Sequence, residues 1–181
     1  MLKQQIDRES FKIETSKSIL SPITTQYAQD IFKEFDEEIT KYMFPIPAKN
    51  ISETIDFINH SIKKNLAGKN IQLVILDKST KEFLGCVGLH EPETSTPELG
   101  IWIKKPVHGK KYGFEAVQQL KLRADENIIF DYLIYPVDHR NISSCKIPER
   151  LGGTTDGKIE LKKTPDPKKI LESITYKIYS K

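Results

Sequence analysis

The 181-residue sequence contains only two cysteines, Cys86 and Cys145, and they lie far apart in the chain. Neither belongs to a CxxC pair, which argues against a zinc ribbon or a thioredoxin-like site. No stretch reaches the ~20 apolar residues of a membrane helix, because Asp131 interrupts the longest candidate, residues 128–137. The N-terminus has no apolar run of signal-peptide length either. We therefore expect a cytoplasmic protein with reduced, buried thiols and no membrane partner.

An excess of charge of one sign is also absent. The chain has 28 Lys and Arg against 25 Asp and Glu, a formal net charge of +3. This balance argues against a nucleic-acid partner, since the one basic run is short and lacks interleaved aromatic residues. Hydrophobic residues make up 38% and charged residues 29%, as in soluble globular proteins. The length predicts a single domain over residues 1–181, and a homodimer is left open.

Hydrophobic periodicity predicts an ordered alternation of strands and helices. Strands are expected at 11–14, 71–76, 83–89, 99–103, 128–135, 154–161 and 174–179, and helices after Ser21-Pro22 and at 50–66, 113–127 and 141–151. Turn-rich connections predict an antiparallel meander for the strands within 71–103, whereas a strand, a helix and another strand predict a parallel pair. The expected fold class is α/β, of the α+β type with a mixed sheet. The sheet is mixed and mostly antiparallel, with one parallel pair and helices on both faces.

Two common phosphate-binding patterns, GxxxxGK[ST] and GxGxxG, are missing, which disfavours ordinary ATP and dinucleotide sites. Residues 98–116 nevertheless join a strand, a basic loop with Gly109 and Gly113, and the start of a helix. The first N–H groups of a helix lack internal partners and carry partial positive charge, so they suit a phosphate. Four lysines, at 104, 105, 110 and 111, add charge. The segment predicts a cofactor that bears a diphosphate.

The run 108–116, HGKKYGFEA, resembles the acetyl-CoA loop of the GNAT superfamily of N-acetyltransferases, in particular its ribosomal-protein (RimJ/RimL-like) branch. Residues 138–144 and 149–152 resemble that branch's N-x-x-S helix and its closing segment. The resemblance implies the GNAT fold, acetyl-CoA as co-substrate and a primary amine as acceptor, attacked directly in a ternary complex. A protein N-terminal amine and a small amine, including an aminoglycoside or polyamine, are both left open.

The resemblance also implies which residues hold CoA. Main-chain groups at 101–103 would pair with the pantetheine arm where two parallel strands splay apart, and backbone amides at 108–114 would cradle the pyrophosphate. With the side chains of the next helix, the expected cofactor-binding residues are Ile101, Trp102, Ile103, His108, Gly109, Lys110, Lys111, Tyr112, Gly113, Phe114, Asn141 and Ser144. Three positions depart from the family pattern. Lys111 replaces a usual glycine or alanine, Gly153 replaces a usual phenylalanine after the helix, and Pro148 stands where many members carry a tyrosine acid.

The candidate catalytic residues are Glu98, as a base acting through water, and Ser144, as the acid or hydrogen-bond donor for the leaving thiolate. Glu91 and Glu93 are alternative bases, and Glu98 and Ser144 have plain surface roles as rival interpretations. The four histidines show no metal-ligand spacing, so no metal is expected.

The acceptor cleft is expected between segments 41–50 and 162–169. The alternative function is a non-catalytic CoA-binding or interaction protein that keeps the fold, which Lys111 and Pro148 favour.

Overall fold

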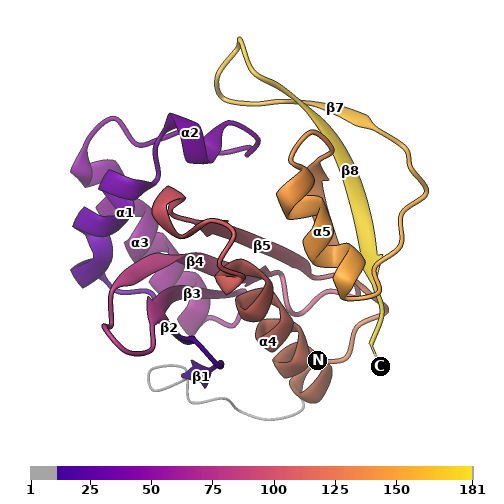
Figure 1. Ribbon diagram of the computed structural model, residues 1–181, viewed down its shortest axis with the longest axis horizontal. Helices are drawn as coiled ribbons and strands as arrows, with labels where there is room; N and C mark the ends of the chain where they lie inside the picture. The colour runs from indigo at the N-terminus through magenta and orange to yellow at the C-terminus, as the bar shows by residue number, and fades with distance from the viewer. Residues whose placement is uncertain (1–11, 181) are drawn as a thin grey trace.

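A computed structural model describes residues 12–180 (Figure 1). In this part of the chain eight strands form one sheet in the order β1-β2-β3-β4-β5-β6-β8-β7. The strands are β1 (Ile13–Glu14), β2 (Ser18–Pro22), β3 (Asn70–Asp77), β4 (Phe83–His90), β5 (Glu98–Ile103), β6 (Leu133–Asp138), β7 (Glu160–Lys163) and β8 (Ile170–Ile178). The helices are η1 (Thr25–Tyr27), α1 (Ala28–Glu34), α2 (Glu37–Thr40), α3 (Ile51–Leu66), η2 (Lys105–Val107), α4 (Tyr112–Asn127) and α5 (Ile142–Arg150).

The strand directions agree with the sequence-based expectation. Strands β3, β4 and β5 form an antiparallel meander. Strand β5, helix α4 and strand β6 form the crossover unit, and β5 and β6 are the parallel pair, aligned at Glu98 and Ile134. The remaining neighbours in the sheet are antiparallel. The mixed, mostly antiparallel sheet is therefore confirmed.

Side-chain alternation along the strands divides the core between the two faces of the sheet. On one face, Val74 and Cys86 pack with Ile31 of α1 and Ile58 of α3. On the other face, odd-numbered strand residues such as Val87 and Leu99 pack with Val117 and Leu120 of α4 and Cys145 of α5. Figure 1 shows α1 beside α3, and α4 and α5 on the other side of the central strands. Helices thus cover both faces, as predicted.

The beginning of the fold differs from the prediction. Ser21 and Pro22 do not start a helix, because Ser18–Pro22 is strand β2, whose alternating buried residues pair with β3. The single helix expected after Ser21-Pro22 is instead two short helices: α1 ends at Glu34, and the Asp36 side chain accepts a 2.9 Å hydrogen bond from the N–H of Ile39 to begin α2. Phe11, the first residue of the earliest predicted strand, lies outside the described residues.

Later boundaries shift by several residues. The strand predicted at 128–135 starts only at Leu133, and of 154–161 only Thr154 forms a bridge, to Lys177, before β7 begins. Helix α3 matches its prediction, since the side chain of Asn50 caps the N–H of Glu53 and Gly68 follows the helix with φ of 73°. Among residues 12–180, no helix has the length and apolar character required to cross a bilayer.

Candidate functional site

The parallel strands β5 and β6 separate almost as soon as they meet. Glu98 and Ile134 are their aligned pair, and the N–H of Ile134 donates to the carbonyl of Pro97 at 2.9 Å. Two residues further along β6, Pro136 faces β5 by strand alternation and has no N–H with which to continue the ladder. Beyond this point the strands enclose a cleft of about 1130 Å³. One proline thus opens the sheet at the predicted splay.

The backbone of β5 borders this cleft with every second residue. The carbonyl of Pro97 and, by alternation, the main-chain groups of Leu99, Ile101 and Ile103 face β6. The carbonyl of Trp102 faces β4 instead, only 2.2 Å from where a Cβ on Gly85 would lie. Ile101 and Ile103 therefore have the orientation that the pantetheine prediction needs. Trp102 contributes its indole to the cleft wall, packed on Phe35 with ring centroids 4.9 Å apart.

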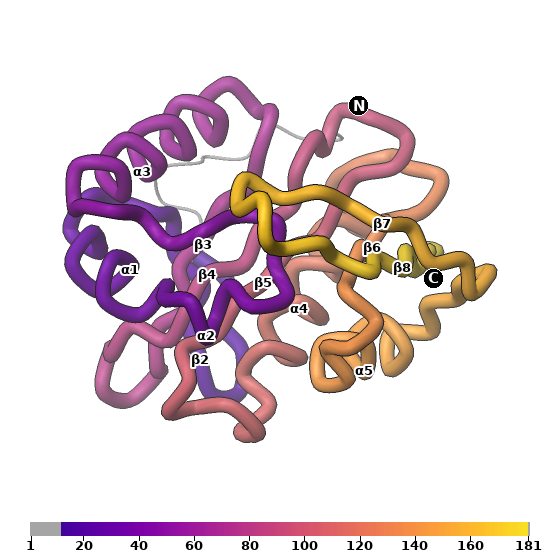
Figure 2. Tube along the Cα trace, turned by 90° about the horizontal axis from the view of Figure 1, so that it is seen from above, coloured from indigo at the N-terminus to yellow at the C-terminus, as the bar shows by residue number. Residues whose placement is uncertain are grey.

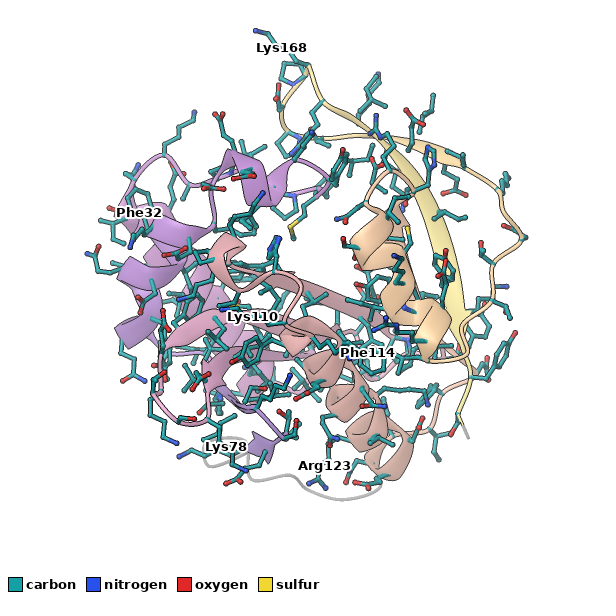
Figure 3. The ribbon with its side chains drawn as sticks, in the orientation of Figure 1. Phe32, Lys78, Lys110, Phe114, Arg123 and Lys168 are labelled. Carbon is teal, nitrogen blue, oxygen red and sulfur yellow. The ribbon has the colours of Figure 1, made fainter. Side chains whose placement is uncertain are left out.

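The N-terminal end of α4 presents unpaired amides at the same cleft. In residues 12–180, the first N–H with a helical partner is that of Glu115, which donates to Lys111 at 3.1 Å, and no protein acceptor lies on the N–H of Gly109 or of residues 111–114. Gly109 has φ of 78° and Lys111 has φ of 70°, so the turn is left-handed at both positions. Figure 3 shows Lys110 and Phe114 at this end of α4. The geometry is that of an anion cradle.

The four lysines around this turn have different roles. Lys104 is buried and ion-paired with Glu82, and Lys105 is ion-paired with Glu38, so neither is free for a ligand as the sequence suggested. Lys110 and Lys111 are exposed and form no ion pair in the described part of the chain. Arg150 of α5 lies over the ring of Phe114, 5.7 Å from its centroid, and also lines the cleft. Among residues 12–180, Lys110, Lys111 and Arg150 therefore remain beside the cradle without an acidic partner.

Two side chains of the loop hold it in place rather than facing a ligand. His108 Nε2 lies 2.6 Å from the carbonyl oxygen of Ile103. The hydroxyl of Tyr112 donates to the carboxylate of Asp77 at 2.7 Å, on the β3 side of α4. The N–H of Tyr112 is left for an anion, whereas the N–H of His108 donates to the carbonyl of Lys105 at 3.1 Å and that of Lys110 to the carbonyl of Val107 at 3.4 Å, so these two predicted amides are already paired.

Helix α5 brings the predicted Asn141 and Ser144 to the opposite wall. The Oδ1 atom of Asn141 accepts from the N–H of Ser144 at 3.2 Å and caps the helix, which leaves the Nδ2 group for a ligand. The hydroxyl of Ser144 is 2.9 Å from the hydroxyl of Tyr135 on β6. Burial raises the pKa of Tyr135 to about 12, so its phenol stays protonated at neutral pH. The sequence interpretation missed Tyr135, because a tyrosine in an apolar strand is typical of a core residue.

Of the three candidate bases, the structure places only Glu98 in the cleft lining. Burial raises the pKa of the half-buried Glu98 carboxyl, Lys162 opposes this change, and Glu91 adds to it. Glu91 itself lies in an exposed turn with φ of 51°, and Glu93 is also exposed. Among residues 12–180, no group of three or more His, Cys, Asp or Glu is placed to hold a metal ion.

The far end of the cleft is mainly apolar. Its lining includes Phe32 of α1, Phe35 directly after this helix, segment 42–49, Phe57 of α3, and Lys162 and Leu171 of the β7–β8 hairpin. Lys169 closes over this end: its ammonium donates to the carbonyls of Thr40 at 3.1 Å and Pro45 at 3.3 Å, and Figure 2 shows the hairpin beside the segment after α2. Both segments predicted to border an acceptor therefore meet at the cleft.

Three comparisons with known proteins agree. Residues 17–154 match the family described as the acetyltransferase (GNAT) domain. An uncharacterised N-acetyltransferase, p20, of Bacillus licheniformis is 27% identical over 124 residues, which cover 67% of this chain and 70% of p20.

Solved structures share the fold at low identity. The RimL ribosomal L7/L12 alpha-N-protein acetyltransferase in complex with coenzyme A has a TM-score of 0.83 at 13% identity, covering 93% of this chain and 98% of its own. The microcin C7 self-immunity acetyltransferase MccE, in complex with acetyl-CoA and AMP, has a TM-score of 0.79 at 21% identity, covering 91% and 93%.

Proposed function

Since the chain belongs to the GNAT acetyltransferase family, we propose that it transfers the acetyl group of acetyl-CoA to a primary amine by direct attack in a ternary complex. The observation that carries the proposal is the coincidence of two features in one cleft. The unpaired amides at the start of α4 and the unpaired edge of β5 both open onto it. The first suits a diphosphate, and the second suits an extended chain of amides such as pantetheine.

Acetyl-CoA would lie along the opening between strands β5 and β6. The N–H groups of Gly109 and of residues 111–114 would bind the pyrophosphate, and Lys110, Lys111 and Arg150 would supply positive charge. The main-chain groups of Ile101, the N–H of Ile103 and the Nδ2 of Asn141 would pair with the pantetheine amides, since the carbonyl of Ile103 already contacts His108. Lys111 fits this arrangement because it is exposed, lines the cleft and adopts the left-handed backbone conformation that the turn requires.

Acetyl transfer changes the charge at three atoms. The acceptor ammonium loses a proton to become nucleophilic, and its nitrogen then attacks the thioester carbon. The carbonyl oxygen gains negative charge, which backbone N–H donors of β5 would stabilise. When the C–S bond breaks, the thiolate takes a proton. The overall reaction converts R–NH₃⁺ and acetyl-CoA into the N-acetyl amine, CoA–SH and one released proton.

Glu98 and Ser144 are proposed for the first and the last proton transfer of this reaction. The carboxylate of Glu98 would attract the ammonium and accept its first proton through water. The hydroxyl of Ser144, backed by the phenol of Tyr135, would donate to the departing sulfur. Bringing both substrates into one cleft supplies further acceleration.

The lining of the far end favours one kind of acceptor. Its surface is aromatic and aliphatic, and the basic residues Lys49 and Lys162 border it. The acidic cluster at 36–38 is used elsewhere, since Asp36 caps α2 and Glu38 pairs with Lys105. A polyamine or aminoglycoside needs several carboxylates, whereas a peptide N-terminal amine or a small apolar amine does not. We therefore place peptide and apolar amines first.

Two measurements test the proposal in order. Thermal unfolding with and without acetyl-CoA measures donor binding, since a ligand that binds the folded state raises the Tm. Release of free thiol from acetyl-CoA is then followed with a short peptide bearing a free N-terminus, 2-phenylethylamine, spermidine and tobramycin. Thiol release with the peptide or phenylethylamine is expected. A raised Tm without thiol release from any amine would favour the non-catalytic CoA-binding alternative instead.

A further inference from the structure

Three polar side chains form a row across the sheet at the acceptor side of the cleft. The register aligns Asn70 of β3 with His90 of β4, and His90 with Glu98 of β5. All three project to the face that α1 and α3 cover, because they share the alternation of Val74 and Cys86. Directly opposed residues in an antiparallel pair have Cβ atoms ~5 Å apart, so these three side chains are neighbours. His90 and Glu98 both line the cleft.

The next row of the sheet makes room for the imidazole. It aligns Gln72, Gly88 and Gly100, and a Cβ on Gly88 or on Gly100 would lie 3.2 Å from the Nε2 atom of His90. Neither glycine has a positive φ, so the backbone conformation does not require glycine there. A side chain at either position would instead crowd the imidazole of His90. The His90 ring occupies that space with its Nε2 atom over two residues of the cleft lining.

The buried side chain of Asn70 sets the protonation of the ring. Its Oδ1 atom lies 2.8 Å from His90 Nδ1. An amide oxygen accepts hydrogen bonds and cannot donate, so Nδ1 carries the proton and Nε2 carries the lone pair. The charged groups around the ring act in both directions. Burial, the largest effect, and Lys64 of α3 lower the pKa of His90, whereas Glu91 raises it. The imidazole is therefore neutral at pH 7.

The geometry points to His90 as a second proton acceptor of the transfer reaction, with Asn70 as its positioning residue. This inference rests on the proposed acetyltransferase function. An ammonium nitrogen must lose two protons to become an amide nitrogen, and a carboxylate that has taken the first must pass it to solvent before it can take another. A neutral Nε2 that faces the acceptor side of the cleft beside Glu98 suits the second.

The step balances as follows. After the neutral amine attacks, the new C–N bond leaves the nitrogen positively charged and the former carbonyl oxygen negatively charged. The Nε2 lone pair of His90 takes one proton from that nitrogen. The oxygen then re-forms the carbonyl, the C–S bond breaks, and the thiolate is protonated from Ser144. The proton on His90 Nε2 and the proton taken by Glu98 pass to solvent, and one solvent proton restores Ser144.

The test starts with the best acceptor from the amine panel and the full-length protein. His90→Gln should lower kcat by about 10²-fold, as expected for loss of a general base, while the acetyl-CoA Kd stays within twofold. The acid limb of the wild-type kcat profile, to which protonation of Nε2 contributes, should be weakened in this variant. His90→Ala should regain part of its rate with added imidazole, which fits the space over Gly88 and Gly100. His60→Gln, on the exposed face of α3, is the matched control and should behave as wild type.

A second readout does not depend on turnover. NMR of the histidine side chains should show His90 as the Nδ1–H tautomer with a pKa below the ordinary 6.5, and Asn70→Ala should abolish the tautomer preference. A His90→Gln variant with wild-type kcat, or an Nε2–H tautomer in the wild-type protein, would overturn the inference and leave the proposed function standing. Wild-type protein that releases no thiol with any amine would overturn both.

Discussion

The phenol of Tyr135 and the hydroxyl of Ser144 lie 2.9 Å apart on the wall of the cleft, joining strand β6 to helix α5. The family resemblance implied a serine near the cofactor sulfur but placed no tyrosine beside it. Pro148, where many relatives carry a tyrosine acid, is buried inside α5. The neighbouring strand therefore brings to Ser144 a protonated phenol, a group that Pro148 cannot supply.

Removing the Tyr135 hydroxyl tests this pair. Tyr135→Phe should lower kcat about fivefold, the equivalent of one neutral hydrogen bond, with little change in the KM for acetyl-CoA. Ser144→Ala should lower kcat more, because it removes the hydroxyl that we propose as the proton donor to sulfur. Steady-state kinetics of both variants and of the double variant make the measurement. Equal effects of Tyr135→Phe on kcat and on acetyl-CoA binding would show that the phenol supports the helix instead.

Glu98→Gln should slow turnover and leave acetyl-CoA binding intact. Only the ionised carboxylate attracts the ammonium and accepts its proton, and burial raises the pKa of Glu98 above its ordinary value. The wild-type rate should therefore fall as the pH drops through the raised pKa. The glutamine variant should lose this component of the pH profile. An unchanged kcat across the pH range would remove Glu98 from the reaction.

Gly109→Glu should weaken acetyl-CoA binding strongly, because it places negative charge against the pyrophosphate. Gly109 has φ of 78° and nothing lies within 4 Å of an added Cβ, so the backbone cost of a side chain here is ~1–2 kcal/mol and no clash occurs. Gly109→Ala carries the same backbone cost without charge. Gly157→Glu carries both at an exposed glycine with φ of 76° outside the cleft lining. Calorimetric titration with acetyl-CoA should rank Gly109→Glu far below both controls.

Asp77 ties the first turn of α4 to the end of β3. Hydrogen bonds from the N–H of Thr80, the hydroxyl of Tyr112 and the N–H of Ser79 lower its pKa from 3.8 to about 2. A lowered folded-state pKa means that the ionised group stabilises the fold above pH 4, and that this contribution is lost as the pH falls toward 2. Asp77→Ala should therefore lower the Tm at pH 7. The difference from wild type should shrink between pH 4 and pH 2 in thermal scans.

The sequence predicted those parts of the fold in which local chemistry and packing agree. Helix α3 has an asparagine cap, an apolar stripe and a following glycine, and its predicted ends are close to those observed. The helix predicted to start at Ser21-Pro22 was wrong, because pairing with β3 and burial of Leu20 favour a strand there. The local preferences of these residues do not reveal a partner strand that lies about 50 residues away in the sequence.

The site shows the same division. The glycine-containing turn before α4 could be predicted because the residues that determine its backbone conformation are consecutive in the sequence. Tyr135 and His90 could not, since each acquires its role from a residue on another element, Ser144 and Asn70. The pairing of Lys104 with Glu82 and of Lys105 with Glu38 was hidden for the same reason.

The interruption at Pro136 also has a mechanical consequence. The sheet consists of two parts, strands β1 to β5 and strands β6, β8 and β7, which share a single aligned pair at Glu98 and Ile134. A ligand that pairs with the free edge of β5 would supply hydrogen bonds that β6 does not and would limit the movement of one part relative to the other. Hydrogen–deuterium exchange of the amides of Ile101 and Ile103 should slow sharply once such a molecule is bound, while the amides of the β3–β4 ladder should not respond.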